Sequence, residues 1–481
     1  MSDIRIERQD EFRWVIPPAG GMRVPGMVYA DERMMKTIAA DESLKQVANV
    51  AHLPGIVGYS LAMPDIHWGY GFPIGGVAAF DMEEGIISPG GVGYDINCGV
   101  RLMATNLQLE EIGDRMRELV IALFHNIPAG VGSASTLKLS VDEEKKVLRQ
   151  GAAWAVNRGY GSENDLAATE DGGAMPGADP SCVSERALER GRQQLGTLGS
   201  GNHFLEIEVV EKIFDRNVAS AFGLHAEGQV AVAIHTGSRG FGYQVCDDYL
   251  ARMVKHSRTI GFPLPDRQLA CAYLSSDEGK EYMAAMACAA NYAWANRQML
   301  MHWTAQTLEK TLQRSPRDIG MRLVYDVCHN IAKIEDCIID GRKRRLCVHR
   351  KGATRALPPG HPALPDMYRH EGQPVLIPGD MGTGSYVLVG TDRALEETFG
   401  STCHGAGRVM SRGKALKASR NRSIAAEMAD RGVVVMAAGK KTLSEEMPEA
   451  YKDIDGVVNV VHRVGLSTKV ARLRAVGCIK G

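Results

Sequence analysis

The chain has 481 residues, of which 44% are hydrophobic and 23% charged, and its formal net charge is −1. This is the composition of an ordinary globular protein. Because the net charge is close to zero, a polyanionic partner would have to be bound by a local patch of cations and not by the field of the whole chain. Residues 1–20 lack the apolar stretch of a secretion signal, and no run approaches the ~18 apolar residues that span a membrane. We therefore expect a cytoplasmic protein with no membrane partner.

Short β-like runs separated by Gly and Pro dominate residues 15–105. From 108 to 157, apolar residues recur at three- and four-residue spacing, which predicts helices. Ser140 followed by Glu143 indicates a capping box at the start of one of them. Residues 157–181 are polar and Gly-rich, so they predict an exposed loop.

The rest of the chain alternates between strand-like and helical patterns. We expect a basic helix at 183–196, strands at 203–210 and 229–236, helices at roughly 243–258 and 277–312, short strands from 320 to 392 and a charged helix around 413–431. No internal repeat, low-complexity tract or clear linker divides the chain. The sequence therefore predicts one interwoven, mixed α+β domain over residues 1–481, with central β-sheets flanked by helices.

Ten cysteines are present and no two form a CxxC pair, which excludes a zinc ribbon and a thioredoxin motif. Most are expected to be small buried hydrophobic residues. Cys98 differs, because it follows Asp95 by three residues in the glycine-rich stretch GVGYDINCGV (91–100). Glycine permits a tight turn, in which residues three apart face the same way, whereas a strand would point them apart. We predict a compact loop that presents an oxygen and a sulfur donor to one point.

Four histidines lie where an apolar run meets a turn containing Gly or Asn: His203, His235, His329 and His404. Strand ends that lead into loops are where ligands and catalytic groups collect. Each of them alone is more simply explained as a hydrogen-bonded core histidine, His203 above all, because it alternates with apolar residues. Together with Asp95 and Cys98, however, they supply the donors of a transition-metal site. Cys328 and Cys403 directly precede two of the histidines, and on extended backbone they should point away and pack.

Three glycine-rich stretches have the composition of a backbone cradle for phosphate: HTGSRG (235–240), PGDMGTGS (378–385) and HGAGR (404–408). Each is weak alone, because a glycine-rich turn is usually only a turn. Arg239, Arg408 and Arg412 add bidentate phosphate donors. Residues 341–355 are rich in Lys and Arg and contain no acid. Such a run is usually a solvated surface, but beside a metal and phosphate site it indicates a track for a nucleic-acid backbone. The combination indicates phosphoryl or nucleotidyl transfer.

Seven motifs, in order along the chain, closely resemble the RtcB family of tRNA-splicing RNA ligases: MPDIHWGYGFPIGG, GVGYDINCGVR, GSGNHF, HTGSRG, YDVCHN, PGDMGTGSY and CHGAGR. The likeness extends from about residue 20 to residue 481 and includes Lys480. The chain departs from the family pattern at Asp380, where serine is common. A carboxylate there would repel a triphosphate unless it meets a metal or a base edge.

The resemblance implies a GTP-dependent ligase with two Mn²⁺ ions per active site. Such an enzyme joins an RNA 3′-phosphate or 2′,3′-cyclic phosphate to a 5′-hydroxyl, in tRNA splicing or RNA repair. Its partners would be RNA, as tRNA halves or broken ends, and an archease-type activator is a candidate partner. By the same resemblance, His404 is the nucleophile that takes GMP as a phosphoramidate.

The remaining roles also come from the resemblance. One metal site would be formed by Asp95, Cys98 and His203, and the other by Cys98, His235 and His329, with the thiolate as bridge. The residues implied in GTP and GMP binding are Asn202, His203, Phe204, Leu205, Glu206, His329, Asn330, Pro378, Gly379, Asp380, Met381, Ser385, His404, Gly405, Ala406, Gly407 and Lys480. For RNA phosphates we expect Arg239, Lys351, Arg408 and Arg412.

Two other functions use the same residues. A metal-dependent phosphoesterase would use the same donors to activate water. An RNA-binding accessory protein would keep the fold with little turnover. His404 argues against both, because neither function needs a histidine nucleophile beside a glycine-rich phosphate loop.

Overall fold

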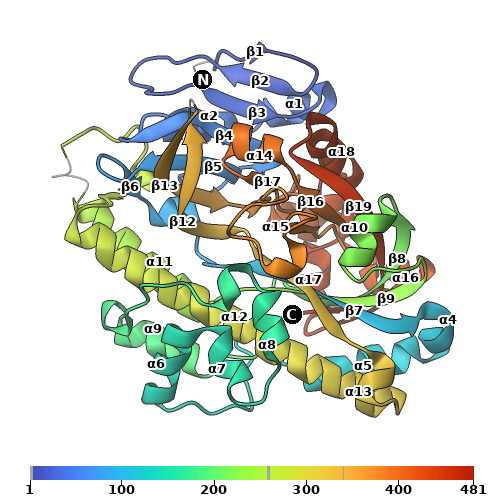
Figure 1. Ribbon diagram of the computed structural model, residues 1–481. Helices are drawn as coiled ribbons and strands as arrows, with labels where there is room; N and C mark the ends of the chain where they lie inside the picture. The colour runs from blue at the N-terminus through green and yellow to red at the C-terminus, as the bar shows by residue number, and fades with distance from the viewer. Residues whose placement is uncertain (1–3, 257–260, 340) are drawn as a thin grey trace.

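The computed structural model describes residues 4–256, 261–339 and 341–481, and two large β-sheets organise it (Figure 1). The first sheet has the order β1 (Glu7–Arg8), β2 (Arg13–Ile16), β3 (Gly26–Tyr29), β4 (Ile56–His67), β5 (Ile74–Asp81), β13 (Arg342–Lys351) and β12 (Asn330–Ile339). The second has the order β11 (Arg322–Cys328), β7 (Gly99–Gln108), β9 (Gln229–Thr236), β8 (Phe204–Ile213), β19 (Ser467–Lys480), β16 (Ser385–Gly390) and β15 (Pro374–Ile377), and β18 (Val434–Ala437) also pairs with β19. Two short pairs join β6 (Ile86–Ile87) to β10 (Ala272–Tyr273) and β14 (Ala353–Arg355) to β17 (Ser401–Cys403).

Helices cover the outer faces of these sheets. In chain order they are α1 (Glu32–Ile38), α2 (Ser43–Val50), α3 (Pro89–Val92), α4 (Leu109–Ile112), α5 (Met116–Asn126), α6 (Val141–Gln150), α7 (Ala152–Val156), α8 (Glu163–Ala167), α9 (Glu185–Arg192), α10 (Arg216–Ala221), α11 (Arg239–His256), α12 (Asp277–Leu312), α13 (Pro316–Ile319), α14 (Asp392–Thr398), α15 (Arg412–Ala418), α16 (Ile424–Asp430), α17 (Lys440–Glu445) and α18 (Ile454–Val464). Short 3₁₀ turns include Glu170–Gly173 and Pro180–Cys182.

The two large sheets meet at His329. β11 belongs to the second sheet and ends at Cys328, and β12 of the first sheet begins at Asn330. The chain therefore passes from one sheet to the other within a single residue. At this point the backbone leaves the hydrogen bonding of one sheet and enters that of the other. Side chains at the neighbouring strand ends can therefore point into the space between the two sheets.

The long helix α12 supports that junction from below, with α6, α7 and α9 on its outer side (Figure 1). Ser276 caps its first turn by accepting from the Gly279 N–H, and α12 runs for 36 residues, about 54 Å at 1.5 Å per residue. Arg297, in its buried middle, donates to the carbonyl oxygens of Asn97 and Thr236 at 2.8 and 2.9 Å. These bonds tie the loop that carries Cys98 and the strand end that carries His235 to one rigid helix.

Residues 157–181 were predicted to be an exposed loop, and this prediction is wrong. The segment contains α8 and two 3₁₀ turns, and Glu170 is fully buried. The Glu170 carboxylate accepts from Lys333 Nζ at 2.6 Å and from the Cys328 N–H at 2.9 Å. A buried carboxylate is stable only when it is paired in this way, and its partners come from distant strands that the local pattern cannot reveal.

The charged helix predicted at 413–431 is two helices, α15 and α16. The chain turns between them at Asn421, whose φ is +64°, and Ser423 caps the second helix by accepting from the Ala426 N–H. At Ser140 the hydroxyl caps Glu143 as predicted. The reciprocal half of that capping box does not appear among the hydrogen bonds of the described residues, since the Glu143 carboxylate binds Lys146, Trp154 and Arg158.

The predicted mixed α+β class, with central sheets flanked by helices, is confirmed. The helices α1 and α2 lie in a region where only strands were predicted. The boundaries 1–481 for one domain stay a prediction. No helix in the described part of the chain combines the length and the apolar character that crossing a bilayer would require.

Candidate metal and nucleotide site

The loop between α3 and β7 presents Asp95 and Cys98 to one point. The Cys98 N–H donates to the Asp95 carbonyl at 3.0 Å and closes a tight turn, in which Asn97 adopts a left-handed φ of 53°. A Cβ atom on Gly237 would lie 2.5 Å from Asp95 Oδ1, so glycine is needed for the HTGSRG turn to pack against this carboxylate. The predicted shared face of Asp95 and Cys98 is confirmed.

The four histidines lie at strand ends, as the sequence predicts. His203 directly precedes β8 and His235 is the next-to-last residue of β9, where it pairs with Phe204. His329 stands between β11 and β12, and His404 directly follows β17. Antiparallel pairing of β8 with β9 brings the ends that carry His203 and His235 together, and β7, which starts directly after Cys98, pairs with both β9 and β11 and so adds Cys98 and His329.

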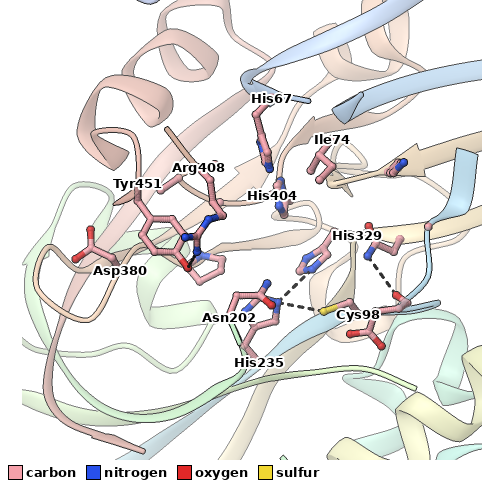
Figure 2. Close-up of a pocket in the computed structure, with 18 of the residues that line it drawn as sticks. His67, Ile74, Cys98, Asn202, His235, His329, Asp380, His404, Arg408 and Tyr451 are labelled. Carbon is pink, nitrogen blue, oxygen red and sulfur yellow. Dashed lines mark hydrogen bonds between the residues drawn. The ribbon is translucent and has the colours of Figure 1, made fainter. Parts of the chain in front are cut away.

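Two groups of donor atoms share Cys98. Its Sγ lies 3.4 Å from His203 Nε2 and 3.3 Å from His235 Nε2. His203 Nε2 is 2.8 Å from Asp95 Oδ2, and His235 Nε2 is 3.2 Å from His329 Nε2. The donor atoms of Asp95, Cys98 and His203 lie within 4.8 Å of one another, as do those of Cys98, His235 and His329. Figure 2 shows the second group converging on one side of the cavity.

Burial controls the charges of these groups. It lowers the pKa of His235 and of His329 well below the ordinary value, so both imidazoles are neutral and keep a lone pair. Burial also opposes the charge of Asp95, but His203 and Arg239 outweigh it and hold the pKa of this carboxyl below its usual range. Burial, followed by the Asp95 charge, raises the pKa of the Cys98 thiol well above normal.

This donor set fits two metal ions better than it fits a packed core. Neutral imidazoles, a carboxylate and a sulfur face each other at 2.8–3.4 Å with more lone pairs than protons between them. The Nδ1 atoms of His235 and His329 are also buried with no hydrogen-bond partner among the described residues. A divalent cation at each group would satisfy the facing lone pairs and would favour the Cys98 thiolate.

His404 is held by Asp65, a residue that the sequence analysis did not single out. The Asp65 carboxylate is fully buried, and its Oδ2 lies 2.5 Å from His404 Nδ1. The same oxygen accepts the backbone N–H groups of His404 and Gly405 at 3.0 and 3.3 Å. The proton on Nδ1 is therefore held by Asp65, which leaves Nε2 of His404 as the free ring nitrogen. Asp65 lies in the motif MPDIHWG, but nothing in its spacing links it to a histidine 339 positions away.

The cysteine–histidine cluster and His404 line one cavity of about 640 Å³ (Figure 2). The His404 ring centroid lies 4.9 Å from that of His329, with Arg408 and Tyr451 on the side away from Cys98. Of the residues implied by the resemblance, the cavity is lined by Asp95, Cys98, Asn202, Phe204, His235, His329, Asn330, Lys351, Pro378, Gly379, Asp380, His404, Gly405, Ala406, Gly407, Arg408, Arg412 and Lys480.

The other residues that the resemblance implies do not line the cavity: His203, Leu205, Glu206, Arg239, Met381 and Ser385. Ser385 donates its hydroxyl hydrogen bond to Glu208. Burial raises the pKa of Glu206, and it raises that of Glu208 with the Glu206 charge as a second cause. Lys480, at the end of β19, opposes the rise at Glu206. Lys480 lines the cavity and Glu206, just outside the lining, keeps 5% exposure, so together they can donate to and accept from the edge of a purine.

Comparison with known proteins decides the family. A family model described as "tRNA-splicing ligase RtcB" matches residues 46–481. The chain is 53% identical to the tRNA-splicing ligase RtcB of Thermococcus kodakarensis and 53% identical to that of Archaeoglobus fulgidus, with 99% of each chain covered in both cases. It is 51% identical to the protein of the same name from Pyrobaculum aerophilum, over the whole of both chains. The chain belongs to the RtcB family. It is therefore an enzyme of an RNA ligase family.

Asp380 is the residue at which we expected this chain to depart from the family pattern, and its carboxylate is bound within its own loop. Its Oδ1 accepts the Gly382 N–H at 2.8 Å and its Oδ2 accepts the Thr383 hydroxyl at 2.7 Å. The carboxylate thus stabilises the loop between β15 and β16, and its charge contributes to the raised pKa of Glu206. The negative charge of Asp380 on the cavity lining favours a base edge that donates hydrogen bonds over a phosphate.

The candidate phosphate-binding cations of this RtcB-family chain differ in their surroundings. Arg239 binds His203 Nδ1 at 2.8 Å and so orients a metal ligand. Arg408 is held by Glu446 at 3.0 Å, whereas the Arg412 side chain is 57% exposed. Burial lowers the pKa of Lys351 to about 7, and its Nζ donates to the carbonyl oxygens of Tyr70 and Phe72.

The basic run at 341–355 is not one continuous track. Arg350 and Arg355 are buried, and each is within ion-pair distance of Glu335. Arg342 to Arg345 lie at the other end of β13 from Lys351, about 20–30 Å away along the strand, and they do not line the cavity. Glu335 neutralises Arg350 and Arg355, so these two buried residues cannot belong to an RNA track. For the more exposed Arg342 to Arg345, RNA binding stays a prediction.

Proposed function

We propose that this protein is a GTP- and Mn²⁺-dependent RNA ligase that joins a 3′-phosphate or 2′,3′-cyclic phosphate end to a 5′-hydroxyl end through a histidine–GMP intermediate. Its substrates would be tRNA halves or broken RNA, with an archease-type activator as a candidate partner. The family, the printed names of the relatives and the cavity support this proposal.

One observation carries the proposal. His404 has one ring nitrogen held by the buried Asp65 and the other free, and its ring lies 4.9 Å from that of His329 at the edge of the cysteine–histidine cluster. A nucleophile for phosphorus needs a free lone pair, a fixed orientation and nearby positive charge. A water-activating phosphoesterase needs the cluster but gives no reason to orient His404 in this way.

The chain's own residues account for the covalent step. Nε2 of His404 attacks the α-phosphorus of GTP, the new P–N bond forms, and the P–O bond to pyrophosphate breaks. The ring then carries a positive charge, which the Asp65 carboxylate stabilises through the Nδ1 proton. Gly407 lets the HGAG turn approach closely, since a Cβ there would lie 2.3 Å from the Asp65 carbonyl oxygen.

The later steps transfer GMP once, to the RNA, and then release it. A cyclic phosphate end is first opened by water to a 3′-phosphate. A 3′-phosphate oxygen then takes GMP from His404 by attack on the same phosphorus, and the histidine nitrogen leaves. Finally the RNA 5′-hydroxyl attacks the activated 3′-phosphate and GMP leaves. Asp95, Cys98, His203, His235 and His329 would hold the metal ions, which when bound withdraw charge from phosphate oxygens in these displacements.

Mass spectrometry after incubation with GTP and Mn²⁺ tests the proposal. We expect the intact protein to gain the mass of one GMP, and to gain nothing with ATP, because the acidic wall around Glu206 and Asp380 favours the donor edge of guanine. A protein that stays unmodified yet releases phosphate from RNA ends would instead be a phosphoesterase. A protein that binds RNA and does neither would be an accessory protein.

Asp65→Asn is expected to slow GMP attachment about 100-fold or more, because an amide no longer fixes the proton on His404 Nδ1 or stabilises the charged ring. Single-turnover mass spectrometry would measure the rate, and elemental analysis should show wild-type metal content. The matched control is Asp41→Asn, since Asp41 also lines the cavity but its carboxylate binds the Trp68 N–H and not His404. A wild-type rate in Asp65→Asn would remove Asp65 from the mechanism.

A further inference from the structure

Trp68 is a large apolar side chain left 59% exposed at the rim of the cavity. It lies just after β4, next to His67, which Figure 2 shows reaching towards His404. The Trp68 backbone N–H is fixed by Asp41 Oδ2 at 3.2 Å. Because the backbone is held, the exposed indole offers an aromatic face in a fixed place at the cavity rim, on which a nucleic-acid base can stack.

A second cavity of about 600 Å³ adjoins the first. The two share four wall residues: Asp41, Trp68, Arg408 and Val409. Lys414 of α15 and Lys452 line the second cavity on the side of the C-terminal region, and Glu42 lies beside Asp41 on the N-terminal side. A chain that lies in the second cavity can therefore pass Trp68 and reach His404.

The segment that follows Arg408 and Val409 in the chain is basic and contains no acidic residue. Residues 411–423, which include α15, contain Arg412, Lys414, Lys417, Arg420 and Arg422. Within the described residues, no carboxylate lies at ion-pair distance from Lys414, Lys417 or Arg420, and all three are exposed. Arg422 is neutralised by Glu427 and Glu449. Three unneutralised cations thus lie along and just beyond the helix α15.

Charge is distributed unevenly across this second cavity. The Trp68 side bears the carboxylates of Asp41 and Glu42, whereas the α15 side bears Lys414, with Lys417 and Arg420 farther along the same segment, outside the cavity lining. A phosphate would be repelled from the first side and attracted to the second. A base, whose amino groups donate hydrogen bonds and whose ring stacks, suits the first side.

We propose that Trp68 and α15 form a binding subsite for the single-stranded RNA end that enters the active site. A base stacks on the Trp68 indole, and the phosphates of that strand lie along Lys414, Lys417 and Arg420. This inference deepens the proposed ligase function and rests on it. An acidic peptide would use the cations but would gain little from an aromatic surface flanked by two carboxylates.

The test uses the full-length protein and a short single-stranded RNA with a 3′-phosphate and one 2-aminopurine. Binding to the wild type should quench the 2-aminopurine by stacking. Trp68→Ala should abolish the quench and weaken binding roughly tenfold, whereas Trp68→Phe should retain most of both. Melting temperature and metal content verify that each variant is folded.

A charge-matched pair tests the phosphate contacts. The double variant Lys414→Gln, Lys417→Gln should weaken binding and reduce the slope of log affinity against log salt by about 1.4, or ~0.7 for each phosphate that is no longer neutralised. The control Lys280→Gln, Lys310→Gln removes the same charge from two exposed positions of α12 that line neither cavity, and it should change neither quantity.

Two results would overturn the subsite. One is a Trp68→Ala variant that binds and quenches like the wild type, and the other is equal weakening in the two charge-matched pairs. An unlabelled acidic peptide that displaces the RNA while Trp68→Ala leaves RNA binding unchanged would assign the surface to protein instead. If the proposed ligase function itself is wrong, a different measurement shows it: the wild-type protein will not become covalently modified with GMP.

Discussion

His404→Ala should abolish GMP attachment to the protein and leave metal binding largely intact. His404 belongs to neither group of metal-donor atoms, and its Nδ1 bonds to Asp65. Removing the nucleophile leaves no atom to form the P–N bond, so no Mn²⁺ concentration restores attachment. Intact-mass measurement would follow GMP, and elemental analysis would follow the metal. Overall ligation of a 3′-phosphate to a 5′-hydroxyl should fall below detection.

A pre-activated substrate separates the nucleophile from the ligands. RNA whose 3′-phosphate already carries GMP bypasses the first two transfers, so His404→Ala should still join it to a 5′-hydroxyl strand. His329→Ala, the control, should fail on that RNA when stripped of metal and recover in part with excess Mn²⁺, since the other donors remain. If folded, metal-loaded His404→Ala fails on activated RNA, His404 must also act in the sealing step.

Cys98→Ala is expected to abolish binding of the second metal and all ligation. Its sulfur is the atom common to both donor groups, at 3.4 Å from His203 Nε2 and 3.3 Å from His235 Nε2. Without it, each group keeps two donors, too few to hold a cation tightly against competing water. Metal per protein, measured by elemental analysis after dialysis, should therefore fall sharply, and ligation should be undetectable.

Cys403→Ala is the matched control for this variant. Cys403 is fully buried on β17 among apolar side chains, and it belongs to no donor group of the described residues. Its loss should cost only packing, about 1–2 kcal/mol of unfolding free energy, measurable by denaturant titration. Equal loss of metal in the two variants would mean that Cys98 is not the special cysteine.

Several local features could be predicted because each depends on neighbours in the sequence. Cys328 and Cys403 precede their histidines on extended backbone, so alternation alone sends their side chains into the core, and both are buried there. The helix predicted at roughly 277–312 is α12, Asp277–Leu312, because helical spacing depends on residues that are close in sequence. The positions of the four histidines at strand ends follow from the same local patterns.

Other features depended on partners that are distant in the sequence. The basic run at 341–355 looked uniform, yet Glu335 neutralises Arg350 and Arg355 while Arg345 stays exposed. The polar stretch at 157–181 looked solvated, yet Glu170 is buried against Lys333. Charge alone does not determine burial. A charged residue is buried where an opposite charge or hydrogen-bonding groups from another element meet it.

The sequence by itself determined the donor atoms of the site and the shared face of Asp95 and Cys98, because glycines and a three-residue spacing act within one turn. Only the tertiary structure decided which carboxylate holds His404. Asp65 reaches it across 339 residues when β17 packs beside the end of β4. Hydrogen bonds between elements depend on how the sheets and helices pack. That packing is set by the burial of apolar side chains and the pairing of polar groups over the whole chain, and not within any one segment.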